Sequence, residues 1–475
     1  METEVSGNKY LATEQHIKAQ IDKGLFHPDD RLPSIRQLSE QLGVSKNTVI
    51  RAYQELEATG WVYSVPKSGY RVKVPNTTSW DAPSQPQKVD LLSVTKSVLS
   101  RPSRRLKLQS GSAHPNINPP AIRSLYAEIG RHSRLQTQLP GYYQLPPGDE
   151  QLVKQLLKIT HDLGVPAGSK EIAITHGAQQ AISLALRALT KPGDIVVVES
   201  PCYFGNLLLL ESLGLQALEI PSSVSHGVDI QALQNALEQW EVKTLLLTPN
   251  FTNPTGSRMP LANRKALLEI TGSLPIIEDD VFGSLAFDAP IASLKKLDDK
   301  DRVIYVNSLS KTLDSRLRIG WLLSGRYQPL IEKYQLCDNM GSSNLMQSAV
   351  GQFLTTGKYR SHLSKMKRLY QTNQKQFQSL LIQALDSYPH LIGRYHLSKP
   401  EGAFINWITL PESLDSYAVY QECLKHKIGI LPGTIFGTHD QYKHCLRFTV
   451  ANIEENKDWK EGIATLAKII AKHVN

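Results

Sequence analysis

The sequence predicts two folded units of different class: a small, mostly helical unit that ends in a β-hairpin, and a large α/β unit built on a mostly parallel sheet. The segment 75–87 separates them, because it is rich in proline and small polar residues and follows neither a helical nor a strand period. Apolar residues before it recur at helical spacing, whereas those after it form short runs between amphipathic stretches. We therefore expect domains over residues 1–75 and 91–475, joined by a linker over residues 76–90.

The composition is that of a globular protein able to bury large cores. Hydrophobic residues make up 41% and charged residues 20% of the 475 residues, unlike a disordered chain. No apolar run approaches the roughly 18 residues that span a bilayer, and the first residues do not resemble a secretory signal. The four cysteines are scattered without metal-ligand spacing. We expect a cytoplasmic protein with reduced thiols, no membrane segment and no metal site.

The formal net charge of +9 indicates a polyanionic partner, but the excess is unevenly placed. Residues 1–75 carry ten basic against nine acidic side chains, whereas residues 76–110 carry six against two. Arg104, Arg105 and Lys107 belong to the second segment, which we expect to add a salt-sensitive, sequence-independent attraction to phosphates. Specific reading of a nucleic acid is expected from individual side chains of the first unit.

The first unit reads as helix, helix, turn, helix and then a two-stranded wing. Apolar side chains four apart predict three helices, which end at Gly24, Gly43 and Gly60. Ser34 and Ser45 can cap the second and third helices at their N-termini. The strands are expected over residues 61–63 and 70–74.

The third helix carries the polar face of a DNA-reading element. Its N-terminal turn and exposed face contain Ser45, Lys46, Asn47, Thr48, Ile50, Arg51 and Gln54. In a helix–turn–helix this end enters the major groove, where short polar groups reach base edges and phosphates. Arg36 is placed to hold the phosphate backbone, and Gly69 lets the wing tip approach the duplex. The alternative is a helical module that binds protein, with Lys46 and Arg51 merely solvated.

Residues 10–74 closely resemble the N-terminal winged-helix domain of the GntR superfamily of bacterial transcription regulators. The resemblance is carried by the runs Gly24–Pro28, Arg31–Leu38, Leu42–Tyr53 and Leu56–Gly60. It implies that the side chains or backbone of Arg36, Ser45, Lys46, Thr48, Arg51 and Gly69 contact double-stranded DNA, and Asn47 lies on the same helical turn. Ile35 departs from the family, which commonly has a serine there.

In the large unit, short apolar runs predict buried parallel strands separated by helices. These strands are expected over residues 172–175, 194–199, 244–248, 275–278 and 302–306, with a helix over 178–189. Ligands of such sheets bind at the carboxyl ends of the strands, and the polar motifs of this unit all lie at those ends.

Lys311 follows one strand end in the run Ser308-Leu309-Ser310-Lys311-Thr312, with Arg318 seven residues later. A lysine whose surroundings keep it partly deprotonated can form a Schiff base with an aldehyde cofactor, while serine and arginine bind a phosphate. Taken alone, the run is more typical of a surface lysine.

Three other segments follow strand ends and add matching chemistry. His176-Gly177-Ala178-Gln179 can direct the amides of Ala178 and Gln179 at an anion on a helix N-terminus. A carboxylate in Glu278-Asp279-Asp280 can keep a pyridine nitrogen protonated. Asn253, in the turn 250–256, can donate to a ring oxygen or a carboxylate. Each segment, taken alone, is also compatible with an ordinary turn.

Jointly and in this order, these motifs resemble the aminotransferase fold of pyridoxal-phosphate enzymes, fold type I, over roughly residues 90–475. The resemblance implies that Lys311 forms the internal aldimine, that Asp279 pairs with the pyridinium nitrogen and that Asn253 bonds the ring oxygen. The other implied cofactor contacts are a stacking ring from Tyr203 and a phosphate site made of Ala178, Gln179, Ser308 and Arg318.

Two further residues carry roles in the same family. Tyr143, in Tyr143-Gln144-Leu145-Pro146-Pro147-Gly148, matches the tyrosine that reaches the neighbouring subunit's phosphate, which implies a homodimer. Arg447 matches the arginine that clamps a substrate α-carboxylate, for which a bidentate guanidinium is suited. One departure is Phe282, which stands where the family usually supplies a tyrosine hydroxyl to the ring oxygen. Its absence leaves cofactor binding intact but argues against fast transamination.

A winged helix joined by a linker to an aminotransferase-like domain resembles the MocR subfamily of GntR regulators. The resemblance implies a cytoplasmic, homodimeric, pyridoxal-phosphate-dependent transcription regulator whose effector is an amino compound. In the second hypothesis the protein is an active aminotransferase with Lys311 as the base, and DNA binding is secondary. In the third, pyridoxal phosphate is itself the signal.

Overall fold

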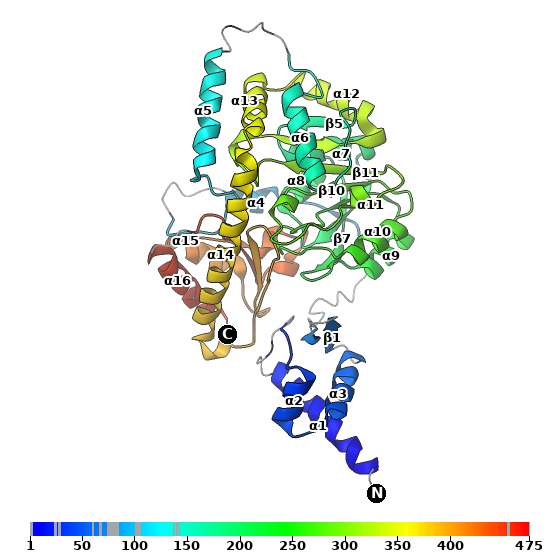
Figure 1. Ribbon diagram of the computed structural model, residues 1–475, viewed down its shortest axis with the longest axis vertical. Helices are drawn as coiled ribbons and strands as arrows, with labels where there is room; N and C mark the ends of the chain where they lie inside the picture. Colours follow the sequence, from blue (N-terminus) through cyan, green and yellow to red (C-terminus); the bar gives the residue numbers. More distant parts are fainter. Residues whose placement is uncertain are drawn as a thin grey trace.

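The computed structural model describes residues 3–22, 26, 30–58, 61–65, 69–73, 85–99, 106–135, 138, 141, 143–453 and 457–474. Figure 1 shows a small N-terminal head, in blue, below a larger body that contains the rest of the chain. The expected helix ends at Gly24 and Gly60, most of the linker, and Arg104 and Arg105 lie outside the described residues.

The head has the predicted order of elements. It consists of α1 (Thr3–Asp22), α2 (Ile35–Leu42), α3 (Lys46–Ala58), β1 (Val62–Val65) and β2 (Gly69–Val72). Ser34 caps the N-terminus of α2 in a capping box with Gln37. Gly43 ends the helix in the left-handed conformation, which glycine adopts readily because it has no Cβ. The antiparallel β1–β2 pair forms the wing. The helices enclose a small apolar core, which includes Ile17, Leu38, Val49, Tyr53, Leu56 and Val72.

The large domain is built on a nine-stranded sheet with the order β3-β7-β6-β9-β10-β11-β12-β5, and β8 pairs with β7. Its strands are β3 (Gln87–Lys88), β5 (Ile172–Thr175), β6 (Ile195–Ser200), β7 (Gln216–Ser223), β8 (Gly227–Val228), β9 (Val242–Leu247), β10 (Ile276–Asp279), β11 (Val303–Ser308) and β12 (Gly320–Leu323). Strands β7, β6, β9, β10 and β11 are parallel, and β12 runs antiparallel between β11 and β5. The mostly parallel sheet is therefore confirmed.

Helices pack around this sheet (Figure 1). They are α5 (Pro120–Leu135), α6 (Glu150–Asp162), α7 (Ala178–Leu189), α8 (Phe204–Ser212), α9 (Ile230–Gln239), α10 (Leu261–Ile270), α11 (Leu294–Leu297), α12 (Gln328–Asn339) and α13 (Asn344–Thr355), with short 3₁₀ turns that include η2 (Gly283–Leu285). The bounds of α7 are those predicted from the sequence.

The linker is shorter than the sequence suggests, because its last residues belong to the large domain. Gln87 and Lys88 form β3 on the edge of β7, and Val89 and Leu91 are buried in the core of the sheet. These two apolar residues follow β3 and anchor this part of the chain in the core of the large domain. The basic segment continues along the same body as α4 (Leu92–Leu99) and β4 (Leu108–Gln109).

A small domain completes the chain. Its antiparallel sheet has the order β13-β14-β17-β16, made of β13 (His396–Leu397), β14 (Ile405–Thr409), β16 (Leu431–Pro432) and β17 (Cys445–Thr449). The helices α15 (Ser416–Lys425) and α16 (Lys457–His473) pack here, and β15 (Ile428–Gly429) pairs with β4. The 29-residue helix α14 (Lys358–Asp386) runs from the large domain into the small one (Figure 1).

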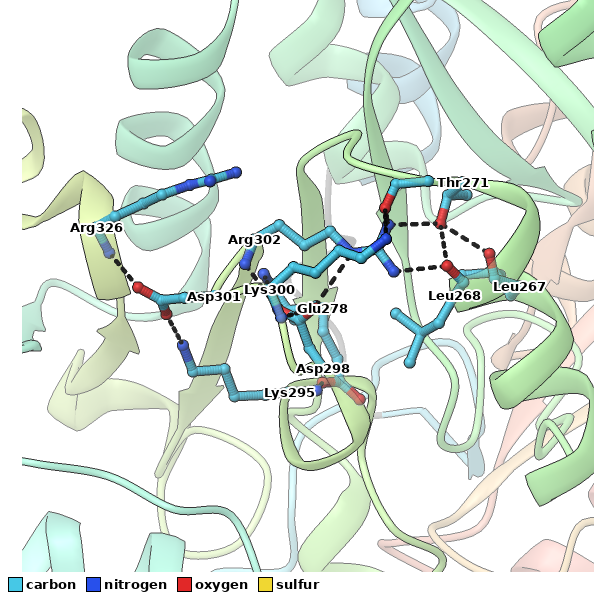
Figure 2. Close-up of polar contacts among 12 residues, drawn as sticks. Leu267, Leu268, Thr271, Glu278, Lys295, Asp298, Lys300, Asp301, Arg302 and Arg326 are labelled. Carbon is cyan, nitrogen blue, oxygen red and sulfur yellow. Dashed lines mark hydrogen bonds and ion pairs between the residues drawn. The ribbon is translucent and has the colours of Figure 1, made fainter.

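Polar contacts close the amino ends of β10 and β11 (Figure 2). The buried Arg302 guanidinium lies 3.2 Å from Asp298 and donates to Leu268 O and Thr271 Oγ1. Asp301 accepts from Lys295 Nζ. These polar groups are paired with one another, whereas the predicted site residues lie at the opposite, carboxyl edge of the sheet. No helix among the residues described here is both long and apolar enough to cross a membrane.

Candidate functional site: a cofactor pocket and a DNA-reading head

The carboxyl ends of β5, β6, β9, β10 and β11 meet at one edge of the large sheet, because these strands are parallel. The residues that follow or end them are Gly177–Gln179, Tyr203, Asn253, Asp279 and Ser308–Lys311. The structure thus brings together motifs that lie more than a hundred residues apart in the sequence, as the strand pattern predicts.

Lys311 is half-buried at the centre of this edge. Its Nζ donates to the Ala113 carbonyl at 2.8 Å and lies 5.6 Å from the centroid of the Phe282 ring. Burial, together with the nearby Arg447 guanidinium, lowers the pKa of Lys311 to about 8, against the opposing effect of Asp279. About a tenth of this amine is then neutral at pH 7, far more than for an ordinary lysine, and the neutral form is the nucleophile towards a carbonyl carbon.

The two neighbouring aspartates have different surroundings, and only one suits a ring nitrogen. Asp280 accepts from Asn250 Nδ2 at 2.7 Å and from Tyr305 Oη at 2.6 Å, so its oxygens are occupied. Asp279 accepts only a long bond from the Val281 amide at 3.3 Å among the contacts of the described residues. Burial raises the pKa of Asp279 to about 7, and the like charge of Asp280 adds to the effect. A pyridinium N–H would supply the partner that this carboxylate lacks.

An anion cradle forms where β5 turns into α7. Gly177 has φ +88°, and a Cβ there would lie 2.3 Å from Arg318 Nη2, so the position requires glycine. Arg318 donates to His176 O at 3.0 Å and lies 3.4 Å from Ser310 Oγ. The first-turn amides of Ala178 and Gln179 have no intrahelical acceptor, because they open the helix. The cradle therefore combines a guanidinium, a hydroxyl and a helix N-terminus, which suits a phosphate.

The side chains of Ser308 and Gln179, both predicted to bind the phosphate, are engaged within the protein. Ser308 Oγ is buried and bonds to Ile319 O and to Ser310 Oγ, each at 2.9 Å, so Ser308 is linked to the cradle through Ser310. The sequence interpretation did not assign Ser310, although the residue stands in the same motif. The Gln179 side chain donates to Gly205 O at 2.6 Å, which leaves its backbone amide for the anion.

The remaining predicted cofactor and substrate residues leave polar atoms unsatisfied in the interior. Asn253 Oδ1 and two nitrogens of the buried Arg447 guanidinium, Nε and Nη1, are without a hydrogen-bond partner among the described residues. Burial lowers the pKa of Arg447 to about 10, and no carboxylate contributes to hold it up. The Tyr203 ring packs over Gly205, where a Cβ would lie 2.4 Å from the ring. The unpaired Arg447 nitrogens suit a ligand carboxylate, and the unpaired Asn253 oxygen suits a ligand hydrogen-bond donor.

The segment 106–119 is a part of the site that sequence reasoning missed. Arg447 Nη2 donates to Gly111 O, Lys311 Nζ to Ala113 O, and Thr449 Oγ1 to Ser112 O. These acceptors are backbone carbonyls, which no side-chain motif reveals. The one sequence signal is Gly111 itself, where a Cβ would lie 3.0 Å from Ile430 O.

Phe282 is buried against Phe404, with ring centroids 5.6 Å apart, and offers no hydroxyl to the site. The nearby Tyr305 hydroxyl is bonded to Asp280 instead. The predicted site residue Tyr143 is 73% exposed, so most of its ring is not covered within the chain.

The head places the predicted DNA-reading residues at one end of α3. Ser45, Lys46 and Asn47 are exposed there. Ser45 Oγ accepts from the Thr48 amide at 3.2 Å and lies 2.8 Å from Thr48 Oγ1, so these two hydroxyls also cap the helix. The N-terminal turn thus leaves Lys46 and Asn47 as its freest polar side chains.

The other three predicted DNA contacts surround this turn. The Arg51 guanidinium stacks 4.1 Å from the Tyr10 ring centroid, an engagement that the sequence did not suggest. The exposed Arg36 pairs with Glu40 at 3.0 Å. Gly69 lies at the wing tip with φ +89°.

Comparison with known proteins matches both parts of the chain. Residues 121–460 match the family of class I and II aminotransferases, and residues 9–72 match the gntR family of bacterial regulatory proteins. The chain is 32% identical to the uncharacterized HTH-type transcriptional regulators YjiR and YdcR of Escherichia coli, over 97% and 98% of its length and 98% and 100% of theirs. It is 25% identical to the HTH-type transcriptional regulator NorG of Staphylococcus aureus, over 93% of its length and all of NorG.

Among solved structures, the fold resembles the kynurenine aminotransferase of Pyrococcus horikoshii, with a TM-score of 0.70 and 26% identity, over 81% of this chain and 94% of that one. The multiple substrate aminotransferase of Thermococcus profundus gives a TM-score of 0.70 at 23% identity, over 80% and 95%. A single chain with a gntR-type head and a class I and II aminotransferase domain has the arrangement of MocR-like regulators. The chain therefore belongs to the class I and II aminotransferase family and, through its head, to the GntR family of HTH-type regulators.

Proposed function

We propose that this protein is a pyridoxal-phosphate-dependent transcription regulator, which binds double-stranded DNA with its head and an amino compound with its large domain. The observation that carries the proposal is the presence, in one chain, of a GntR-type head and of Lys311, Asp279 and Arg318 at one sheet edge. When bound, the cofactor supplies an electrophilic aldehyde carbon that an amine can attack.

Each residue of the pocket has a definite task in this proposal. Arg318, Ser310 and the amides of Ala178 and Gln179 hold the phosphate, because each offers a donor to an anion. Asp279 would hold the proton on the ring nitrogen, and Asn253 would donate from its side-chain Nδ2 to the ring oxygen. Tyr203 covers the ring face.

Lys311 and Arg447 connect the pocket to the segment 106–119. Lys311 would hold the cofactor at its aldehyde carbon, where the amine of an effector would compete with the Lys311 amine. Arg447, whose Nε and Nη1 have no hydrogen-bond partner among the described residues, would bind the carboxylate of that amine. Both side chains also hold the segment 106–119, through Ala113 O and Gly111 O. An amine with a carboxylate would therefore alter both contacts at once.

This coupling gives the effector a route towards the DNA head, because the linker leads into β3 and α4, and these precede the segment 106–119 in the chain. The structure also has an exposed ion pair between the head and the small domain, Asp30 to Lys399 at 2.7 Å. An exposed pair contributes at most about 1 kcal/mol, so it allows the head to change position. The effector shifts DNA affinity only if it binds the two arrangements unequally.

A homodimer is part of the same proposal. Tyr143, Leu145 and Met340 are large apolar residues that are 73%, 52% and 58% exposed. They belong to two neighbouring segments, joined by the bridge between Gln144 and Ser342. A second copy would cover this patch and bring its Tyr143 to a cofactor phosphate. The protein is expected to sediment as a dimer at micromolar concentration.

The test measures DNA binding and cofactor conversion on the same purified chain. DNA retained from a random pool supplies the operator, and fluorescence anisotropy then gives its Kd with pyridoxal phosphate alone and with added amino acids. The proposal expects an amine-dependent change in Kd, which Arg447→Met removes and Arg326→Met, as an exposed control, does not. Rapid conversion of the cofactor to the pyridoxamine form by many amino acids would instead establish the aminotransferase.

The aminotransferase alternative is favoured by the retention of both Lys311 and Arg447, but Phe282 provides no hydroxyl for the ring oxygen. In the third alternative the cofactor is the signal, and pyridoxal phosphate alone would release the DNA. The same titrations separate all three functions.

A further inference from the structure

A second cavity, of about 360 Å³, lies among α6, η2, the end of α13 and the start of α14. None of the residues assigned above to the cofactor or to its substrate lines it. Its volume falls within the roughly 300–1,000 Å³ of pockets that bind small molecules.

The walls of the cavity are largely apolar, with a cationic rim. Ile159, Leu163, Ala286, Pro290, Leu354 and Leu363 form the apolar part. Asp162 also lines it, but both of its oxygens are taken by Arg360, at 3.0 and 2.7 Å. The other two cations, Lys158 and Lys367, have no carboxylate partner among the described residues. The cavity therefore carries an uncompensated positive charge beside an apolar surface.

Lys367 is the stronger indication of an anion site, because it is half-buried whereas Lys158 is exposed. Burial lowers the pKa of its ammonium, and no acidic group offsets the effect. A desolvated ammonium without a counter-ion is costly in a protein, and an anion in the cavity would relieve that cost.

Two further groups favour an anion. The Ser284 hydroxyl lines the cavity, is 5% exposed as a residue, and makes no hydrogen bond with the described residues. Gly357, also in the lining, begins the 29-residue helix α14 without a side-chain cap. The positive end of that helix dipole therefore faces this region.

The cavity adjoins the segments that hold the cofactor. Tyr359, in its wall, donates to Thr312 Oγ1 at 2.9 Å, and His362 Nε2 lies 3.0 Å from Thr312 O. Thr312 directly follows Lys311. On the other side, Gly283 and Ser284 follow Asp279 by four and five positions. A molecule in the cavity would therefore contact residues adjoining both Lys311 and Asp279.

We propose that this cavity binds a small monocarboxylate with an apolar body, and that its occupancy changes the ionisation of the cofactor site. One half-buried lysine matches one negative charge, and the apolar walls match a hydrocarbon chain or ring. The binding claim stands without a cofactor, whereas the coupling claim rests on the proposed function.

The test uses hexanoate, hexylamine and hexan-1-ol as probes of the full-length protein by calorimetry, with and without pyridoxal phosphate. We expect hexanoate to bind and hexylamine not to bind. Hexan-1-ol should bind at least tenfold more weakly than hexanoate. Lys367→Met should weaken hexanoate tenfold or more, whereas Lys365→Met, an exposed lysine on the same helix, should not. Leu354→Trp, which fills the cavity, should also abolish binding; thermal melts of all variants check that they are folded.

Several results would overturn the proposal. If Arg447→Met rather than Lys367→Met removes hexanoate, the ligand occupies the substrate pocket. If inorganic phosphate binds as tightly as hexanoate, the ligand class is wrong. The coupling claim predicts that hexanoate shifts the midpoint of the cofactor's absorbance titration with pH, and an unchanged midpoint refutes it. Failure of pyridoxal phosphate to bind at all would refute the proposed function and leave the calorimetric result in place.

Discussion

Gly177→Ala tests the anion cradle with the sharpest structural contrast that the chain offers. A Cβ at this position would lie 2.3 Å from Arg318 Nη2 and 2.8 Å from Arg318 Cζ. The obstructing atoms are the end of a flexible side chain, so the guanidinium should move and the fold should survive. The backbone at φ +88° and ψ 169° adds strain of about 1–3 kcal/mol to folding.

The larger effect should fall on cofactor binding. Loss of hydrogen bonds from a charged donor costs about 1.5–3 kcal/mol, which corresponds to about 10- to 150-fold weaker binding. We expect the Kd for pyridoxal phosphate, measured by absorbance or fluorescence titration, to rise by that factor. In the double variant Gly177→Ala with Arg318→Ala, the two effects should not add, because both remove the same contact.

Gly193→Ala is the matched control. Gly193 also has a positive φ, of +94°, but a Cβ there would meet nothing within 4 Å. This variant should lose a similar amount of stability in chemical denaturation and keep the wild-type Kd for the cofactor. If Gly177→Ala binds pyridoxal phosphate like the control, Arg318 does not hold the phosphate and the proposed cradle is wrong.

Three further predictions follow from the same structure. The pKa of Asp279 is raised from 3.8 to about 7 in the folded protein, so the native state binds more protons than the unfolded state between these values and loses stability as pH rises through them. Asp279→Asn should therefore match the wild type near pH 4 and be more stable by more than about 1 kcal/mol at pH 8 when the cofactor is removed; parallel stability curves would contradict this. Ser34→Ala should destabilise the head by about 1 kcal/mol in urea melts of the full chain, because it removes the capping box of α2, and an unchanged first transition would count against it. Lys46→Ala should weaken DNA binding and reduce the salt slope by about 1, while Lys154→Ala on the large domain should leave both unchanged.

The sequence was informative wherever function depends on a strand end followed by a characteristic side chain. Asp279 ends a buried strand, and Lys311 and Asn253 follow such strands by three and six residues. Parallel strands carry such residues to one edge of the sheet. The bounds of α7 were predicted correctly, because Gly177 and the apolar period mark them. The helices of the head could be predicted equally well, since Ser34 and Gly43 are local signals for the two ends of α2.

The features that escaped prediction depend on contacts between distant backbone segments. Gly111 O and Ala113 O become part of the pocket only because β4 pairs with β15, more than three hundred residues later. The short β3 was assigned to the linker, because two residues beside a proline-rich stretch give no strand period. The cavity beside Lys367 arises from four separate elements and has no motif at all.

The central claim is that the ligand state of Lys311 controls DNA affinity. The most direct test compares the wild type with Lys311→Ala, as full-length proteins, on the same labelled operator. The Kd is measured by anisotropy with pyridoxal phosphate, in the absence and presence of a mixture of the standard amino acids. We expect the amino acids to change the Kd of the wild type for the operator by at least about fivefold, the lower end of typical allosteric coupling. They should leave the Kd of Lys311→Ala unchanged. Equal Kd values for both proteins under every condition would contradict it.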